Sequence, residues 1–225
     1  MLARIVNRLP VSFRTRYRYS WYRLRFGARS IIGAAVRSLR RPPLPDIDKE
    51  GLKLHLGCGD VDLPGFVNID VSPAPHVHHV RRVERLPLFA DGTVDLIYAS
   101  HVLEHFPHES VVGVLSEWRR VLKPGGVLRL SVPDFDKLLA IYEACDRDLG
   151  PIIGMLYGAQ ADPFDFHGTA FTARSLEGAL RRAGFSAVRA WVPGVDTPAP
   201  GDWSTARIEA AGRSFELSLN LEGVK

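Results

Sequence analysis

The sequence contains little cysteine, little lysine and no long apolar run. The two cysteines, Cys58 and Cys145, are too few for a disulfide framework, and reduced thiols are the default in a cytoplasmic protein. No apolar run approaches the roughly 18 residues that a membrane-spanning helix requires. The apolar run 31–36 is short and lies among arginines, which makes it a poor signal peptide. We therefore expect a cytoplasmic protein that folds as one α/β domain with appendages.

Positive charge is concentrated at the N-terminus. Residues 1–45 contain 11 arginines and no lysine, aspartate or glutamate, which gives +11. The remaining 180 residues contain 18 basic and 25 acidic side chains, which gives −7 and brings the sum to the overall net charge of +4. The sequence therefore divides into a basic arm, residues 1–45, and a mildly acidic domain, residues 46–225.

Aromatic residues are interleaved with the arginines of the basic arm. This pattern is typical of a segment on an anionic membrane surface, where aromatic rings lie at the headgroup level. We expect the arm to bring the protein to the inner face of the membrane. Two alternatives stay open: contact with nucleic-acid phosphates, which we favour less, and a solvated extension without a specific partner. The aromatic residues are Phe13, Tyr17, Tyr19, Trp21, Tyr22 and Phe26, and the prolines of residues 42–45 indicate a linker.

Short apolar segments alternate with amphipathic ones beyond the linker. The apolar spacing predicts helices over residues 110–122, 135–145 and 172–183, the last with Thr172 as its N-cap. Such alternation is typical of an α/β, Rossmann-like, mostly parallel sheet with helices on both faces, here closed by C-terminal antiparallel strands. The predicted strands are residues 54–56, 65–70, 77–83, 93–100, 127–132, 185–192 and 215–221.

Several sequence motifs carry candidate chemistry. A G-x-G turn at residues 57–59 follows the first strand, and glycine lets the backbone approach a bulky ligand because it has no Cβ. Asp70 ends the second strand, where an acid in nucleotide-binding α/β folds accepts hydrogen bonds from ribose hydroxyls. The motifs are LHLGCGD (54–60), GFVNID (65–70), LPLFADGTVDLIYASHVLEH (86–105), RVLKPGGVLRLSVPD (120–134), HGTAFT (167–172) and AGF (183–185).

In this order and spacing, the motifs resemble those of the class I S-adenosylmethionine-dependent methyltransferases. The resemblance spans roughly residues 52–192. It implies S-adenosyl-L-methionine as the cofactor, methyl transfer to an oxygen of a glycan or other small acceptor, and no resident metal. Within the family, LHLGCGD, GFVNID and VPDFD look most like small bacterial methyltransferases of surface-glycan pathways.

The resemblance also implies roles for individual residues. His101 and His167 are candidate bases for the acceptor proton, because the protein must position the acceptor and deprotonate a hydroxyl. A helix-entry role for His101 and a loop-ordering role for His167 are the alternatives. Asp134 is a lower-ranked candidate for acceptor contact. The expected cofactor-binding residues are Leu56, Gly57, Cys58, Gly59, Asp70, Leu86, Ser100 and His101.

Some positions depart from the family pattern. His55 stands where an acid often precedes the first glycine, and Val61 stands where a third glycine is common. Only residues 58–65 separate the first two strands, whereas a parallel crossover normally needs a dozen or more residues and a helix. We therefore expect the first helix to be reduced to a turn. Arg82 and Glu84 lie nearest to the position of the family's adenine-contacting acid, and neither is given that role.

Three other functions are alternatives to methyl transfer. HVLEH at residues 101–105 matches the H-x-x-E-H pattern of inverted zinc proteases, in which His101 and His105 would share a helix face. A methyltransferase-like protein without activity could bind a partner or an anionic surface through the basic arm. A dinucleotide-dependent enzyme is disfavoured because no G-x-G-x-x-G motif is present. Further histidines that could add metal ligands are His76, His78, His79 and His108.

Overall fold

A computed structural model of the chain describes residues 33, 35, 42–46, 51–195 and 202–225. Most of the basic arm, and with it the membrane contact predicted for the arm, lies outside the described residues. No helix in the described part of the chain is both long enough and apolar enough to cross a membrane.

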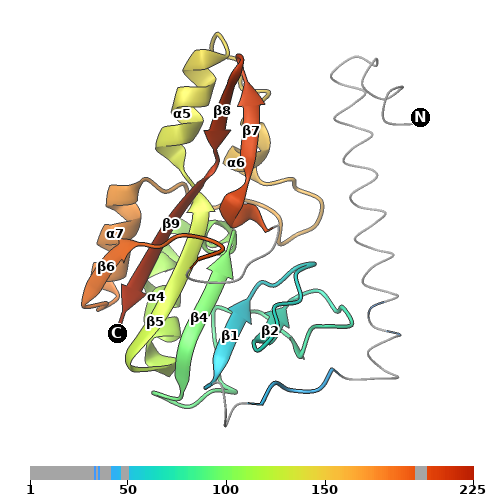
Figure 1. Cartoon of the computed structure of the whole chain (residues 1–225), viewed down its shortest axis with the longest axis vertical. Coiled ribbons are helices and arrows are strands. Elements are labelled where there is room, and N and C mark those ends of the chain that lie inside the picture. Colours follow the sequence, from blue (N-terminus) through green and yellow to red (C-terminus); the bar gives the residue numbers. More distant parts are fainter. Residues whose placement is uncertain (1–32, 34, 36–41, 47–50, 196–201) are drawn as a thin grey trace.

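The centre of the fold is a seven-stranded sheet (Figure 1). Its strands are β1 (Lys53–Leu56), β2 (Val67–Asp70), β3 (His79–Val80), β4 (Val94–Ser100), β5 (Leu122–Pro133), β6 (Ala187–Ala190) and β9 (Ser218–Val224). They lie in the order β3-β2-β1-β4-β5-β9-β6. The first five strands pair in parallel, and β9 runs antiparallel between β5 and β6. The mostly parallel Rossmann-like sheet and the C-terminal antiparallel pair are therefore as predicted.

Helices and one hairpin complete the fold. The helices are the 3-10 helices η1 (Leu103–His105), η2 (His108–Ser110) and η3 (Trp203–Thr205) and the α-helices α4 (Val111–Val121), α5 (Phe135–Ala144), α6 (Ile153–Tyr157) and α7 (Ala173–Arg182). The hairpin consists of β7 (Arg207–Ala210) and β8 (Arg213–Glu216). The three helices predicted from apolar spacing correspond to α4, α5 and α7.

Helix α7 shows how local sequence sets the start of an element. Thr172 precedes it in extended conformation, and its side chain accepts a hydrogen bond from Ser175 N at 3.2 Å. The Ser175 hydroxyl accepts in return from Thr172 N at 2.9 Å, which completes a capping box. The predicted N-cap at Thr172 is thereby confirmed.

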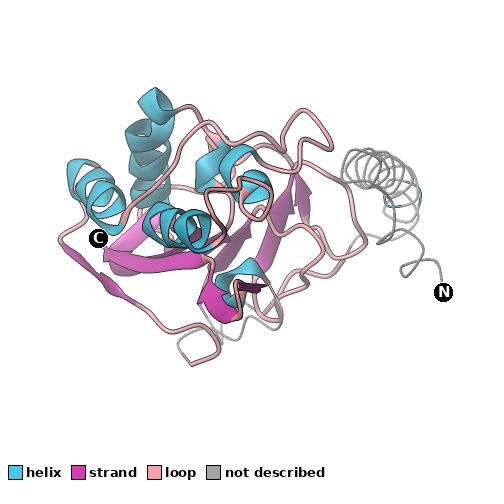
Figure 2. Cartoon of the chain, turned by 90° about the horizontal axis from the view of Figure 1, so that it is seen from above, coloured by secondary structure: helices cyan, strands magenta, loops and turns pink. Residues whose placement is uncertain are grey.

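The main core lies between the sheet and the pair of helices α4 and α7 (Figure 2). Helix α4 buries residues at i, i+3, i+4, i+7 and i+10, because this spacing returns to one helix face. Its Trp118 is fully buried and donates a hydrogen bond to Val83 O at 2.8 Å. Burial of each large apolar side chain contributes roughly 1.5–3 kcal/mol.

The opposite face of the sheet carries a smaller core. Leu63 and Phe66 from the β1–β2 connection pack there with Tyr98 and Trp191. The helical contribution on this face is η3, since Tyr98 Oη bonds to the carboxylate of its N-cap, Asp202. Helices were expected on both faces of the sheet. Among the described residues, α4 and α7 cover one face, and only the 3-10 helix η3 lies on the other.

The connection between β1 and β2 contains no helix, as predicted. Residues 57–66 form turns and irregular backbone. The G-x-G turn at their start is tied to β2, because Gly57 N donates to Ile69 O at 2.8 Å. This connection therefore stays close to the strand ends.

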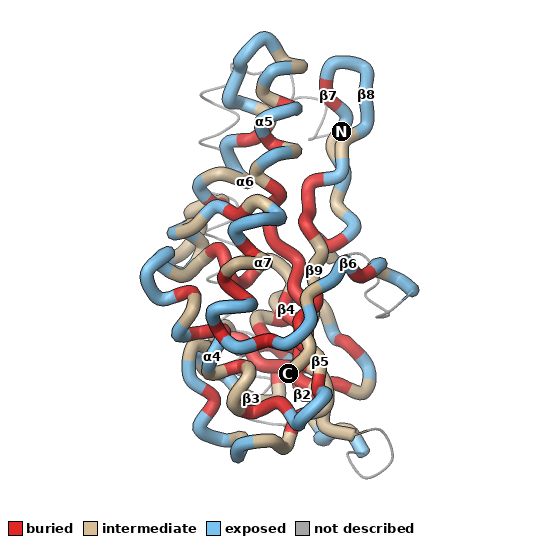
Figure 3. The backbone as a smooth tube through the Cα atoms, turned by 90° about the vertical axis from the view of Figure 1, so that its left-hand side faces the viewer, coloured by how far each residue is buried: buried red, intermediate tan, exposed pale blue. Residues whose placement is uncertain are grey.

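The hairpin β7–β8 differs from the sequence prediction. Residues 215–221 were expected to form one strand, but β8 ends at Glu216 and β9 begins at Ser218. Ala211 and Gly212, which join β7 to β8, have positive φ angles of 49° and 70°, as a tight hairpin turn requires. The hairpin packs with α5 beyond the carboxyl end of β5, and much of it is exposed (Figure 3).

His55 is a buried titratable residue in β1. It is 2% exposed, and its Nδ1 lies 3.2 Å from Asn68 Oδ1. Its ring packs against Phe66 and Tyr98 on the face opposite α4. Burial lowers the pKa of His55 to about 4, because the charged imidazolium would lose its hydration.

Lowering the pH from 6.5 to 4 is expected to reduce the free energy of unfolding by up to about 3 kcal/mol through His55. The unfolded chain protonates this residue near pH 6.5, whereas the folded chain does so only near pH 4. Urea denaturation across this range measures the loss. The variant His55→Phe keeps an aromatic ring and should show a flatter dependence. An unchanged dependence in the variant would contradict the assignment to His55.

Candidate functional site

The G-x-G turn and Asp70 meet at the carboxyl ends of β1 and β2. Gly57 and Gly59 have positive φ angles of 62° and 53°, which glycine adopts readily. Gly59 N donates to Asp70 Oδ2 at 2.8 Å, and Ser72 N donates to Asp70 Oδ1 at 2.7 Å. His76 Nε2 lies 3.1 Å from Gly59 O. The two sequence motifs therefore form one structural unit.

The two glycines of this turn have different surroundings. A Cβ on Gly57 would overlap the side chain of Val102 in the segment that follows β4. The packing of that segment therefore requires glycine at position 57. A Cβ on Gly59 would meet nothing within 4 Å. Among the described residues, the turn therefore has space for a Cβ at Gly59 but not at Gly57.

Asp70 is largely buried beside this turn. It is 8% exposed, and each carboxylate oxygen accepts one backbone hydrogen bond while retaining another lone pair. A carboxylate held in this way is suited to accept hydrogen bonds from neighbouring hydroxyls of a ribose.

Three of the expected cofactor-binding residues have packing roles in the structure. Leu56 and Leu86 are fully buried in the main core. The backbone of Leu86 is also occupied, since its N–H donates to Glu117 and its carbonyl accepts from Arg120. Cys58 packs its side chain with Ala74 and Val77. The backbone of Cys58 is also engaged, since its N–H donates to Ile69 O and its carbonyl accepts from Val61 N. Leu86 likewise has no backbone group left to offer.

Ser100 and His101 lie at the carboxyl end of β4, next to the G-x-G turn. His101 has a φ angle of 54°, an uncommon backbone conformation for a side chain of this kind. Its Nε2 lies 2.8 Å from Ser218 Oγ, and Ser218 donates its hydroxyl proton to Trp203 O. Nε2 of His101 must therefore carry the proton in its bond to Ser218. Nδ1 lies 3.1 Å from Glu104 Oε1. With both nitrogens engaged, His101 fits a positioning role better than the role of a base.

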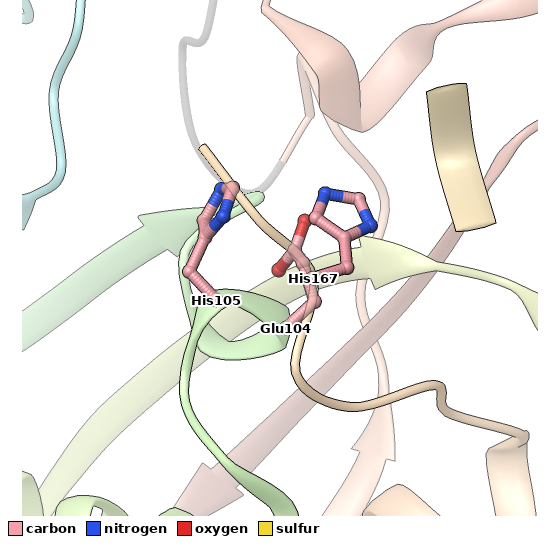
Figure 4. Close-up of side chains that lie close together, drawn as sticks. All are labelled: Glu104, His105 and His167. Carbon is pink, nitrogen blue, oxygen red and sulfur yellow. The ribbon is translucent and has the colours of Figure 1, made fainter. Parts of the chain in front are cut away.

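Glu104, His105 and His167 form a compact cluster beside this edge (Figure 4). Glu104 and His105 come from η1, and His167 comes from the loop that precedes α7. The two imidazole rings are 4.9 Å apart between centroids. The loop is tied to η1 through its backbone, because Gly168 N and Thr169 N both donate to Glu104 O. The sequence indicated His167 as a site residue. It did not indicate that Glu104 and His105 form a cluster with His167.

The charges in this cluster influence one another. Burial by itself raises the pKa of the Glu104 carboxyl, but His101 foremost, with His105 and His167, outweighs burial and holds that pKa below its usual range. Burial lowers the pKa of His167, and the charge of Glu104 opposes this effect. At neutral pH the cluster therefore contains an ionised carboxylate and a neutral His167.

The H-x-x-E-H pattern does not form the helix that a zinc protease requires. Residues 103–105 adopt a single 3-10 turn, and His101 precedes it with a left-handed backbone. His101 and His105 therefore do not share a helix face, and the inverted zinc-protease interpretation is wrong for this segment.

The remaining candidates have structural partners. Asp134 is the N-cap of α5, where its side chain accepts from Asp136 N at 3.2 Å. Arg82 is paired with Glu84, and its guanidinium lies 5.6 Å from the centre of the Phe164 ring. The residues near the family's adenine position are thus in contact with the loop that carries His167.

A family comparison agrees with this arrangement. Residues 65–130 match the model of the methyltransferase domain family. The matched segment runs from β2 through most of β5 and includes Asp70, Ser100 and the Glu104–His105 pair. Residues 65–130 are therefore similar to a methyltransferase domain, which confirms the resemblance indicated by the sequence motifs.

The chain is also similar to parts of known proteins. The ubiquinone/menaquinone biosynthesis C-methyltransferase UbiE of Vibrio vulnificus is 34% identical over 118 residues, 49% of this chain and 44% of that protein. The chain thus matches less than half the length of that relative. A methyltransferase of Burkholderia thailandensis solved with 1,6-didemethyltoxoflavin and S-adenosylhomocysteine has a TM-score of 0.48 at 18% identity, over 86% of this chain and 76% of that one. A SAM-dependent methyltransferase from Archaeoglobus fulgidus has a TM-score of 0.49 at 16% identity, over 92% and 99%.

Alanine at Gly57 is expected to destabilise the fold more than alanine at Gly59. Both substitutions force a left-handed backbone, at a cost of about 1–2 kcal/mol each. Gly57→Ala additionally overlaps Val102, which adds about 1–3 kcal/mol, whereas Gly59→Ala points into open space. Equilibrium urea denaturation of both variants measures the difference. Equal losses would show that the close contact between Gly57 and Val102 does not constrain the turn.

Proposed function

We propose that this chain is an S-adenosyl-L-methionine-dependent methyltransferase that acts on an oxygen of a glycan or other small acceptor. The observation that carries the proposal is the unit formed by Asp70 and the G-x-G turn. This unit has a carboxylate hydrogen-bonded to a glycine turn at the carboxyl ends of β1 and β2, where α/β sheets bind their ligands.

The residues of this edge fit the cofactor in chemical terms. Asp70 would accept hydrogen bonds from the ribose hydroxyls, and the G-x-G turn to which it is bonded would lie beside the ligand. S-adenosyl-L-methionine supplies a methyl group already activated on a sulfonium. The chain therefore has to hold the acceptor next to that methyl group, exclude competing water and accept the proton of a hydroxyl.

The loop that carries His167 would contact the acceptor, because its backbone is bonded to η1, which follows the carboxyl end of β4. Ser100 ends β4 in register with Ser131 of β5, at the edge that also carries Asp70. The resemblance to surface-glycan methyltransferases and the basic arm together favour an acceptor near an anionic membrane. A cytoplasmic protein that binds the inner membrane face through residues 1–45 is consistent with both features.

Asp70→Asn is expected to weaken the binding of S-adenosylhomocysteine by at least about 10-fold, since hydrogen bonds to a charged acceptor contribute roughly 1.5–3 kcal/mol. Isothermal titration calorimetry measures the dissociation constants of the wild type and the variant. Asp146→Asn is the matched control, because Asp146 is exposed beyond α5 and asparagine tolerates its left-handed backbone.

Two outcomes of this titration oppose the proposal in different ways. Wild-type affinity in Asp70→Asn would place the cofactor elsewhere. No binding by the wild type would favour a methyltransferase-like protein that has no transfer activity and acts through its basic arm.

Replacing the 11 arginines of residues 1–45 with glutamine in the full chain should abolish binding to anionic vesicles. Each basic residue near such a surface contributes about 1 kcal/mol, so the combined loss is large. Co-sedimentation with phosphatidylglycerol vesicles, and with neutral phosphatidylcholine vesicles as the control, measures the effect. Undiminished binding in the variant would remove the membrane role of the arm.

A further inference from the structure

The cluster of Glu104, His105 and His167 combines three side chains that could bind a metal ion. Each residue offers one ligand atom, and these atoms all lie within 4.8 Å of one another. The residues come from segments more than 60 positions apart in the chain, and Figure 4 shows the three side chains converging from η1 and from the loop before α7. Carboxylate oxygen and imidazole nitrogen are the ligands of many divalent metal ions in proteins.

Glu104 is buried without the hydrogen bonds that a carboxylate needs. It is 0% exposed, and neither carboxylate oxygen accepts a well-aligned hydrogen bond. The nearest basic group is the His101 ring, whose Nδ1 is 3.1 Å from Oε1, and Oε2 has no ion-pair partner among the described residues. Burial of a polar group without hydrogen-bond partners costs free energy. A bound cation would give this carboxyl group a partner.

The two histidines are already oriented as metal ligands. His105 Nδ1 lies 3.2 Å from Phe166 O, and His167 Nδ1 lies 2.9 Å from Met155 O. A carbonyl oxygen can only accept, so each Nδ1 carries the proton and each Nε2 keeps its lone pair. Metal-binding histidines are commonly fixed in this way by a backbone carbonyl.

We propose that Glu104, His105 and His167 bind one divalent transition-metal ion. Two imidazole nitrogens and one carboxylate oxygen suit Zn²⁺ and neighbouring ions of the first transition row better than Mg²⁺ or Ca²⁺. Ligands about 2.1 Å from an ion are roughly 3.4 Å from each other, so the side chains move inward by about 1 Å on binding. Three protein ligands leave at least one coordination position open.

The open position gives the ion a role in the proposed function, on which this part of the inference rests. The ion would bind a hydroxyl oxygen of the acceptor beside Ser100 and His101 and lower the pKa of that hydroxyl. The O–H bond then breaks, the proton passes to water, and the oxygen keeps the electron pair. The oxygen uses this pair to bond to the methyl carbon while the carbon–sulfur bond breaks, and the pair of that bond stays on the sulfur of S-adenosylhomocysteine. This removes the need for a histidine base, which agrees with the engaged nitrogens of His101.

Titration of the EDTA-treated full chain with ZnCl₂ tests the site directly. Calorimetry is expected to show one tight site per chain in the wild type. His105→Ala and His167→Ala should each weaken binding by at least about 100-fold, since each removes a ligand. His108→Ala is the matched control, because His108 is exposed in η2 close to the cluster and offers no ligand to it, and its affinity should equal that of the wild type. Co²⁺ substitution provides a second readout through a visible absorption band of the wild type and the control.

The outcomes separate this inference from the proposed function. No Zn²⁺ binding by the wild type, or wild-type affinity in both ligand variants, overturns the metal site. S-adenosylhomocysteine titrated into the metal-free chain tests the cofactor site alone, so its binding can persist when the metal site fails. Circular dichroism spectra identify any variant that loses its fold, and Glu104→Gln, which keeps the size of the side chain and removes its charge, then replaces that variant.

Discussion

The attachment of the G-x-G turn to β2 is the constraint on which the candidate site depends. Parallel neighbouring strands usually need a helical crossover, yet the chain returns from β1 to β2 through residues 57–66 without one. The hydrogen bonds of Gly57 N to Ile69 O and of Gly59 N to Asp70 Oδ2 hold this short connection in place. The second of these bonds also fixes the Asp70 carboxylate against the turn.

The segment that carries His167 connects this turn to the metal-ligand cluster. Asp162, in the same loop as His167, has a pKa raised by burial, with Asp165 and Asp70 adding to the effect and His105 opposing it. A single acidic side chain thus responds to the charges of both Asp70 and His105. Strands β2 and β4 end at the same edge of the sheet, so the candidate cofactor site at Asp70 and the proposed metal site on η1 belong to one edge.

The sequence was sufficient for features that depend on local periodicity. The apolar spacing of residues 110–122 and the Thr172 cap predicted α4 and α7, and the short spacing between the first two strands predicted the missing crossover helix. Asp70 at the end of β2 was also placed correctly. These features could be predicted because each depends on residues close together in the chain.

Features that depend on distant contacts could not be predicted. The β7–β8 hairpin turns at Ala211-Gly212, a weak turn signal in a segment without clear alternation. Leu86 lies next to a family motif, but contacts with α4 place its side chain and backbone in the core. The Glu104–His105 pair forms a cluster of possible metal ligands only together with His167, which is distant in the sequence. The pattern H-x-x-E-H suggested a helix, whereas the chain forms a 3-10 turn.

Hydrogen–deuterium exchange with and without S-adenosylhomocysteine tests most directly whether the ligand binds at the carboxyl ends of β1, β2 and β4. Binding there should slow exchange in peptides that contain residues 57–60, 70–73 and 100–105, and leave the hairpin 207–216 unchanged. Protection confined to other segments, in a chain that demonstrably binds the ligand, would contradict the placement of the site.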